Sequence, residues 1–179
     1  KLYRNTENCG LTQNLNKGLK MAEGKYIARM DGDDFCLPTR FEKQVKYFEE
    51  HPNTMLISCW TQNFGASFLH AKLRENSEGL KTRMLVRPVF AHPGFMMRRV
   101  LVEEGYFYDE TFRTAQDYEF ASRVAERYQI GMVREILLYY RIHDKQISSL
   151  AGTEQFNNAD RVRENLWKKA GITLTLEEK

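Results

Sequence analysis

The sequence is poor in cysteine and has no long hydrophobic run, and each absence excludes a class of protein. Its three cysteines, Cys9, Cys36 and Cys59, are odd in number and far apart, so they form neither a disulfide framework nor a zinc-ligand pattern. We expect them to be small, buried apolar side chains in a reducing compartment. No apolar run reaches the ~18 residues that a membrane span requires. No secretory signal is visible either, but the chain begins at Lys1 rather than Met, so a leader or a whole segment could have been removed.

A strong excess of one charge is missing as well. The net charge is only +3 and the chain carries 24 acidic residues, which argues against a nucleic-acid partner. The glycines form no phosphate-binding loop of the P-loop or dinucleotide type, and neither Gly-x-Ser-x-Gly nor His-Glu-x-x-His occurs. What remains is a globular composition, with 42% hydrophobic and 28% charged residues, in a chain of 179 residues that suits one domain with or without an appendage.

The first sixty residues alternate between strand and helix patterns. Residues 1–5 look like the end of a strand, and after them we expect a helix capped by Thr12 and stopped by Gly24, followed by a strand over 26–30. The next helix is expected to begin at Pro38, to have Phe41, Val45 and Phe48 on its apolar face, and to end at 51–53. A further strand is expected over 55–60. Strand, helix and strand at this spacing predict an α/β fold with a mostly parallel sheet flanked by helices.

The second part of the chain is less regular. Residues 61–78 predict only a strand and a loop that faces a ligand or a partner. Later segments predict a strand end over 89–92, a helix over 100–104 stopped by Gly105, a helix from Gln116 or Asp117, strands over 132–133 and 136–141, and an amphipathic helix over 154–170. We therefore expect one α/β domain over residues 1–150, followed by a helix and tail over 151–179.

The sequence Asp31-Gly32-Asp33-Asp34 is the densest group of carboxylates that follows a predicted strand. At the carboxyl end of a strand, such oxygen donors suit Mg²⁺ or Mn²⁺, which in turn would bind a diphosphate. Asp and Gly are also common turn residues, and Asp34 could cap the next helix. On spacing alone the two interpretations are evenly matched.

Asp117 is a second candidate. It stands at the start of a predicted helix, where a carboxylate is favoured by the free N–H groups, so a helix cap is the default interpretation. The functional alternative is a general base that takes a proton from an attacking hydroxyl.

The histidines and arginines carry weaker signals. His143 follows a strand and opens a polar loop, a good place for a ligand contact, whereas His92 either lines a pocket or is structural. Arg98, Arg99 and Arg141 could pair with phosphate, although scattered arginines are usually only solvated.

Taken in order, these segments resemble the family 2 glycosyltransferases of the GT-A fold. The resemblance extends from Asn5 to about Ser149 and rests on six motifs in the right order and spacing: Asn8-x-Gly10-Leu11-Thr12 with Asn16-x-Gly18, Ala22-x-Gly24-x-Tyr26-Ile27 running into Asp31-x-Asp33-Asp34, His92-x-Gly94-x-Met96-x-Arg98-Arg99, Gly105-x-Phe107-x-Asp109-Glu110, Gln116-Asp117-Tyr118-Glu119, and Tyr140-Arg141-x-His143 with Ser148.

The resemblance implies transfer of a sugar from a nucleotide-sugar, usually a UDP-sugar, to a hydroxyl of a glycan or lipid-linked acceptor. By position, Asp33 and His143 match the residues that bind the divalent ion, Mn²⁺ or Mg²⁺, and Asp31 matches a residue near the ribose or sugar of the donor. Asn16 and Arg98 are expected to help line the donor pocket.

Asp117 matches the base that deprotonates the acceptor, which implies inverting chemistry with a single carboxylate and a leaving diphosphate stabilised by the metal ion. The family usually has Glu-Asp at this point, and this chain has Gln116-Asp117. The base is retained, whereas the acceptor contact that the Glu normally makes is altered.

The chain also departs from the family pattern at its start. The segments that bind uracil and ribose are absent, because Lys1 falls about where the third strand should be. We therefore expect the chain to be the C-terminal two-thirds of a GT-A domain, lacking roughly 60–90 residues at ~30 per strand–helix unit. Such a piece is expected to be inactive alone and to self-associate through its exposed sheet edge.

Two other functions fit the same residues. One is a different metal-dependent phosphate enzyme, a nucleotidyltransferase that uses the same aspartates. The other is a non-catalytic donor-binding or scaffold subunit of a polysaccharide assembly complex, which Gln116 favours and the intact Asp117 argues against. The resemblance further implies a cytoplasmic location in bacterial-type glycan synthesis, with peripheral contact at the inner membrane face. We expect the basic, aromatic C-terminal helix to pack on the domain.

Overall fold

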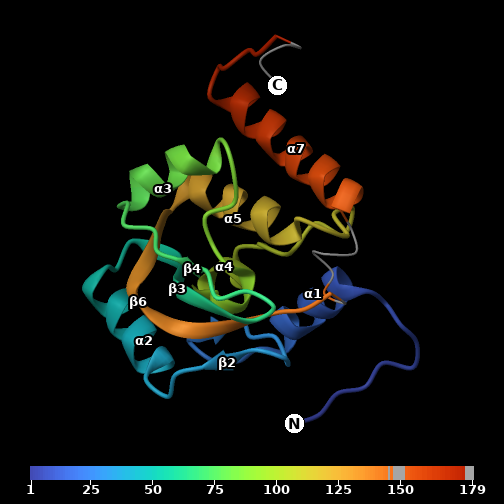
Figure 1. Ribbon diagram of the computed structural model, residues 1–179, viewed down its shortest axis with the longest axis vertical. Helices are drawn as coiled ribbons and strands as arrows, with labels where there is room; N and C mark the ends of the chain where they lie inside the picture. The colour runs from blue at the N-terminus through green and yellow to red at the C-terminus, as the bar shows by residue number, and fades with distance from the viewer. Residues whose placement is uncertain (145, 147–151, 176–179) are drawn as a thin grey trace.

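A computed structural model describes residues 1–144, 146 and 152–175 (Figure 1). Helices lie on both faces of a curved, six-stranded sheet. The elements in chain order are α1 (Leu11–Met21), β1 (Tyr26–Ala28), β2 (Phe35–Cys36), α2 (Arg40–Glu50), β3 (Thr54–Gly65), β4 (His70–Ala71), α3 (Ser77–Met84), the 3-10 helix η1 (His92–Gly94), β5 (Met96–Arg98), α4 (Val100–Glu103), α5 (Gln116–Arg127), β6 (Gln129–Ile142) and α7 (Gly152–Lys169).

The strands run in the order β1-β5-β3-β6-β2, and β4 pairs with β3 at the side of this path. Only β3 and β6 pair in parallel; the other pairs among the described strands are antiparallel. The α/β class is confirmed, but the sheet is mixed rather than mostly parallel. β1, β3 and β6 do share one direction, because β1 and β3 are both antiparallel to the β5 that lies between them.

The register explains why β5 runs backwards. Ala28, the last residue of β1, lies opposite Met96, the first residue of β5. The chain enters β5 from η1, which therefore sits at the carboxyl end of β1, so β5 must return along the sheet. A Cβ on Gly94 would lie 2.4 Å from the Oγ atom of Ser58, so only glycine lets η1 pack this closely on β3.

Successive strand residues point to opposite faces, as a pleated sheet requires. Ile57 and Met96 pack with Phe48 of α2 on one face, while Leu56 and Met97 belong to the larger core on the other face. That larger core also receives side chains from α3, α5 and α7. None of the described helices is long and apolar enough to cross a membrane.

Several predicted elements are confirmed. The helix that ends at Gly105 is α4, and this glycine has a φ of +86°, the left-handed region that suits glycine. The helix from Gln116 is α5, and the C-terminal amphipathic helix is α7. The two runs 132–133 and 136–141 belong to one long strand, β6.

Other predictions were wrong. Thr12 is not the N-cap, because it lies inside α1, whose N-cap is Gly10. Its buried hydroxyl instead donates to the carbonyl oxygen of Phe112 at 2.9 Å. Pro38 precedes α2, which begins at Arg40. Residues 1–5 and 89–91 form no strand, and the strand β5 and helix α3 were not predicted.

The expectation that the cysteines are buried holds for Cys59 but was wrong for Cys9 and Cys36, which are half-buried; none of the three is in a disulfide. The C-terminal helix α7 does pack on the domain, since its Val162 is only 2% exposed within the larger core.

Candidate active site

A cavity of about 510 Å³ opens where the carboxyl ends of β1 and β6 meet η1 and the first turns of α5 and α7. Strands of one direction bring their carboxyl ends to the same edge of a sheet, where ligands bind in open α/β folds. The cavity is lined by, among others, Arg29, Asp31, Asp33, His92, Gln116, Asp117, Arg141, His143 and Gln155.

The structure brings together four of the expected site residues. Asp31, Asp33, Asp117 and His143 all line this cavity, although they come from segments up to 112 residues apart in the sequence. The remaining two, Asn16 and Arg98, do not line it.

Asp31, Asp33 and Asp34 form a tight group, with one carboxylate oxygen of each within 4.8 Å of the others. Their surroundings differ. Arg29 forms a two-point ion pair with Asp31, with Nη1 donating to Oδ2 at 2.8 Å. Asp33 is more exposed, and its Oδ2 lies 3.2 Å from Nε2 of His143.

Asp34 has a structural role, since it connects the aspartate loop to β6. It is buried, and its Oδ1 accepts the backbone N–H of Arg141 at 2.8 Å, which ties the aspartate loop to β6. Its Oδ2 has no hydrogen-bond partner in the part of the chain that is described. Burial raises the pKa of Asp34 to about 6, with the charges of Asp31 and Asp33 adding and the Arg141 N–H opposing. The bond goes to β6, so Asp34 is not the cap of α2.

Asp117 is the second residue of α5 and faces the cavity. The residue before the helix, Ala115, has a φ of 56°, a left-handed conformation that turns the chain into α5. Burial raises the pKa of Asp117, and backbone N–H groups at the helix start, with Arg29 nearby, oppose the rise. Asp117 thus combines a helix-terminal position with access to the cavity, and the two interpretations made from its sequence position are compatible.

His92 is buried at the wall of the cavity. Its Nε2 lies 2.8 Å from the hydroxyl of Tyr108, and its ring meets Phe95 edge-on with centroids 4.9 Å apart. Burial holds the pKa of His92 well below its usual range, so the ring is neutral. Both alternatives for His92 hold, since it lines the pocket and is structurally satisfied.

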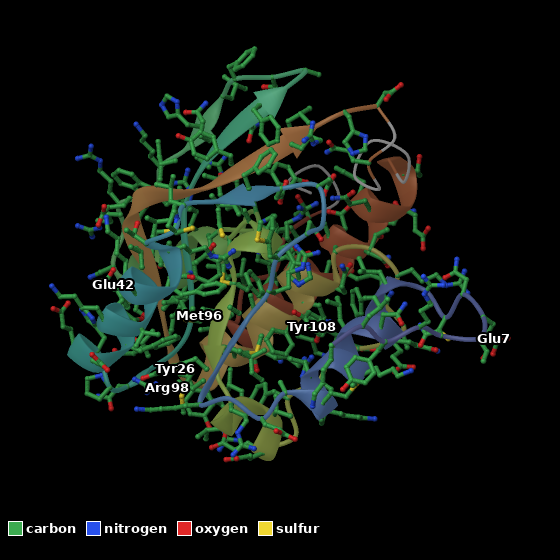
Figure 2. The ribbon with its side chains drawn as sticks, turned by 90° about the horizontal axis from the view of Figure 1, so that it is seen from below. Glu7, Tyr26, Glu42, Met96, Arg98 and Tyr108 are labelled. Carbon is green, nitrogen blue, oxygen red and sulfur yellow. The ribbon has the colours of Figure 1, made fainter. Side chains whose placement is uncertain are left out.

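Asn16 and Arg98 form hydrogen bonds with backbone groups of the fold and do not line the cavity, so their positions do not support the expected donor-pocket roles. Arg98 donates from Nε to the carbonyl oxygen of Thr54 at 2.8 Å and from Nη2 to that of Phe48 at 2.6 Å. Figure 2 shows Arg98 beside Tyr26, at the end of β5 opposite Met96. Asn16 bonds both the N–H and the carbonyl of Tyr108, at 2.8 and 2.9 Å.

Arg99 and Arg141, the two other arginines that could pair with phosphate, differ in position, and only Arg141 lines the cavity. Arg99 pairs with Glu103 on α4 at 2.7 Å. Arg141 lines the cavity, and its Nε donates to the carbonyl oxygen of Asp33 at 2.9 Å.

Two buried residues of α2 that the sequence analysis missed hold backbone segments that adjoin the cavity. Arg40 donates to the carbonyl oxygens of Arg29 and Phe95 at 2.8 and 3.2 Å, and Gln44 donates to that of Gly94 at 2.8 Å. Both side chains are 0% exposed. The only available signal was their spacing of four residues, which places them on one helix face with Phe48.

Comparison with known sequences identifies the family. The sequence model described as glycosyl transferase family 2 matches residues 1–106. An uncharacterized glycosyltransferase of Methanocaldococcus jannaschii is 32% identical over 149 residues, which cover 79% of this chain and 50% of the relative. The amylovoran biosynthesis glycosyltransferase AmsE of Erwinia amylovora is 52% identical over 50 residues, 28% of this chain and 19% of the relative. The chain spans about half the length of the relatives that it matches over most of its own length.

Solved structures share the fold. S. aureus TarS in complex with UDP-GlcNAc superposes with a TM-score of 0.68 at 17% identity, covering 88% of this chain and 46% of that one. The mannosyltransferase PcManGT from Pyrobaculum calidifontis, in complex with GDP-Man and Mn²⁺, gives a TM-score of 0.63 at 15% identity, covering 99% and 59%. These neighbours have the GT-A fold. Because the family match spans more than half of the sequence and the archaeal relative is 32% identical over 79% of it, the chain belongs to glycosyl transferase family 2.

Proposed function

We propose that this chain forms the metal- and acceptor-binding half of a glycosyltransferase that moves a sugar from a nucleotide-sugar, in the first instance a UDP-sugar, to an acceptor hydroxyl with inversion. The observation that carries the proposal is that Asp33, His143 and Asp117 line one cavity at the carboxyl edge of the sheet. The solved neighbours, one with UDP-GlcNAc and one with GDP-Man and Mn²⁺, support a nucleotide-sugar donor. Relatives named for amylovoran and minor teichoic acid biosynthesis support a role in surface polysaccharide synthesis.

The residues present fit a divalent ion. Asp33 and His143 offer a carboxylate oxygen and an imidazole nitrogen 3.2 Å apart, and both side chains are partly exposed to the cavity. Asp31 is already neutralised by Arg29, so Asp33 and His143 are the residues that would hold Mn²⁺ or Mg²⁺. The ion, when bound, supplies positive charge to the departing diphosphate.

Asp117 is the proposed general base. Its carboxylate accepts the proton of the acceptor hydroxyl as that oxygen bonds to the anomeric carbon, on the side opposite the bond to the diphosphate. Displacement from the opposite side inverts the configuration. The Arg29–Asp31 ion pair lies in the same cavity, and we place Asp31 beside the ribose or sugar of the donor.

The test is thermal unfolding of the full-length protein with UDP, GDP or CMP, each with and without Mn²⁺. A nucleotide at about 100 times its dissociation constant adds ~2.7 kcal/mol, a rise in Tm of about 5–10 °C for a protein of this size class. We expect one nucleotide to give this rise only with Mn²⁺. Asp33→Asn should remove the dependence on Mn²⁺, whereas Asp117→Asn should keep it.

No rise with any nucleotide would overturn the proposal in favour of a scaffold subunit. Turnover of a nucleoside triphosphate without any sugar would instead favour the nucleotidyltransferase. The cytoplasmic location and the peripheral membrane contact implied by the family resemblance stay predictions.

A further inference from the structure

The helix α7 contributes to the cavity from outside the part of the chain that the family model matches. Gln155, in its first turn, lines the same cavity as Asp117, and both residues lie beyond residue 106, where the family match ends. Gln155 is half-buried, and within the described residues its side-chain amide has no hydrogen-bond partner. Its donor and acceptor atoms are therefore available to a molecule in the cavity.

Buried contacts fix the position of Gln155. One turn further along α7, the Nδ2 atom of Asn158 donates to the hydroxyl of Thr114 at 2.9 Å, and both residues are buried. Thr114 lies just before α5, which begins at Gln116. Residues three apart share a helix face, so the Asn158–Thr114 bond holds Gln155 at the end of α5 that carries Asp117. Figure 1 shows α7 starting beside this end of α5.

Around the start of α5, the cavity is lined by the uncharged polar side chains of Thr114 and Gln116 and by the Asp117 carboxylate. Gln116 is 6% exposed, and its side-chain amide, like that of Gln155, has no protein partner among the described residues. Of the two described arginines that line the cavity, Arg29 is paired with the Asp31 carboxylate, and Arg141 donates to the backbone carbonyl of Asp33. An anionic acceptor group beside Gln155 would be repelled by the neighbouring Asp117 carboxylate, and this repulsion is strong in a buried site.

Amides both donate and accept hydrogen bonds, as sugar hydroxyls do. We propose that Gln155 is a specificity-determining residue that hydrogen-bonds an uncharged sugar acceptor beside Asp117. This inference rests on the proposed function and adds to it the class of the acceptor and the contribution of α7.

The test uses the full-length protein with the nucleotide-sugar that corresponds to the stabilising nucleotide. Methyl glycosides of neutral hexoses, methyl glycosides of hexuronic acids, and hexose phosphates serve as acceptor probes. We expect transfer to neutral glycosides only. Gln155→Met keeps the length of the side chain but removes its hydrogen bonds, and it should raise the acceptor KM about three- to tenfold while leaving the donor KM unchanged. Asn157→Met, at an exposed position of the same helix, is the matched control and should leave both constants unchanged.

An unchanged acceptor KM in Gln155→Met, or an equal rise in the control, would overturn the role of Gln155. Transfer to the charged probes alone, or to none of the neutral glycosides, would overturn the acceptor class. Both results leave the proposed function standing, provided that the nucleotide and Mn²⁺ still stabilise the protein. Loss of that stabilisation in the wild-type protein would overturn the function and this inference together.

Discussion

Asp117 lies at a helix start, where N–H groups favour its ionised form, and in a cavity wall, where burial disfavours it. Burial is the larger effect, so its pKa is raised above the ordinary 3.8. A base works only when ionised, so we expect the rate of transfer to fall as the pH decreases through this raised pKa. Asp117→Asn should reduce transfer at least about 100-fold at neutral pH and abolish this acidic limb.

The matched control for that prediction is Asp160→Asn, which removes a carboxylate paired with Arg163 on α7. It should leave both the rate and the pH profile unchanged. Transfer by Asp117→Asn at a rate within a few-fold of the wild type would contradict the assignment of the base.

A separate prediction concerns the effect of His92 on the pH dependence of the free energy of unfolding. The pKa of His92 in the folded protein lies well below 6.5, so at pH values just below 6.5 the unfolded chain binds a proton at this residue and the folded protein does not. The contribution of neutral His92 to stability is therefore complete above pH 6.5 and is lost as the pH falls, by up to about 1.4 kcal/mol per pH unit. Urea unfolding between pH 7.5 and 5 should show a smaller loss in His92→Gln than in the wild type.

The comparison of variants isolates His92 from Asp34 and Asp117. The raised pKa values of Asp34 and Asp117 have the opposite effect, because carboxyl groups that bind protons more readily in the folded protein increase its stability as the pH falls. His70→Gln, on the exposed strand β4, should keep the wild-type dependence on pH. Equal dependence in all three proteins would show that His92 does not stay neutral in the folded state.

At the scale of elements, α2 holds the backbone beside the cavity through hydrogen bonds from Arg40 and Gln44. Gln44→Met removes the donor to the Gly94 carbonyl in a fully buried place, so we expect the free energy of unfolding to fall by about 1–3 kcal/mol. Lys46→Met, exposed on the same helix, should change it by less than about 0.5 kcal/mol. Similar denaturation midpoints for the two variants would argue that the Gly94 carbonyl finds another donor.

The same helix shows why the sequence alone misjudged an element. Its apolar residues Phe41, Val45 and Phe48 predict the buried face, yet Phe41 is 52% exposed and the buried positions are Arg40, Gln44 and Phe48. Two polar side chains are buried because carbonyl oxygens at the ends of β1 and η1 accept their hydrogen bonds. No property of the helix sequence records those acceptors, because they come from segments up to 55 residues away.

At the scale of the whole molecule, the sheet ends in a strand that is paired on one side. Among the described residues β1 pairs only with β5, through bonds such as Arg29 N–H to the Phe95 carbonyl at 2.9 Å. Antiparallel bonding alternates, so the N–H of Ala28 points away from β5. We expect this chain to self-associate through that edge, and Ala28→Pro, which removes the N–H, to weaken the association.

Light scattering during size-exclusion chromatography measures this association over a range of concentrations. Ala28→Ser, which keeps the N–H, is the control and should behave as the wild type. A wild-type chain that stays monomeric throughout, or a proline variant that associates as strongly, would contradict pairing at this edge.

Local pattern alone determined the helix that ends at Gly105, the helix from Gln116 and the amphipathic C-terminal helix, because their caps and apolar spacing act within a few residues. The order of short motifs also determined the family and the choice of Asp31, Asp33, Asp117 and His143, all four of which line the cavity. Only the tertiary structure decided that β5 inserts antiparallel between β1 and β3, that Asn16 and Arg98 serve the scaffold, and that Gln155 of α7 reaches the cavity. These features depend on hydrogen-bond partners and strand neighbours far away in the sequence, whose positions exist only once the chain has folded.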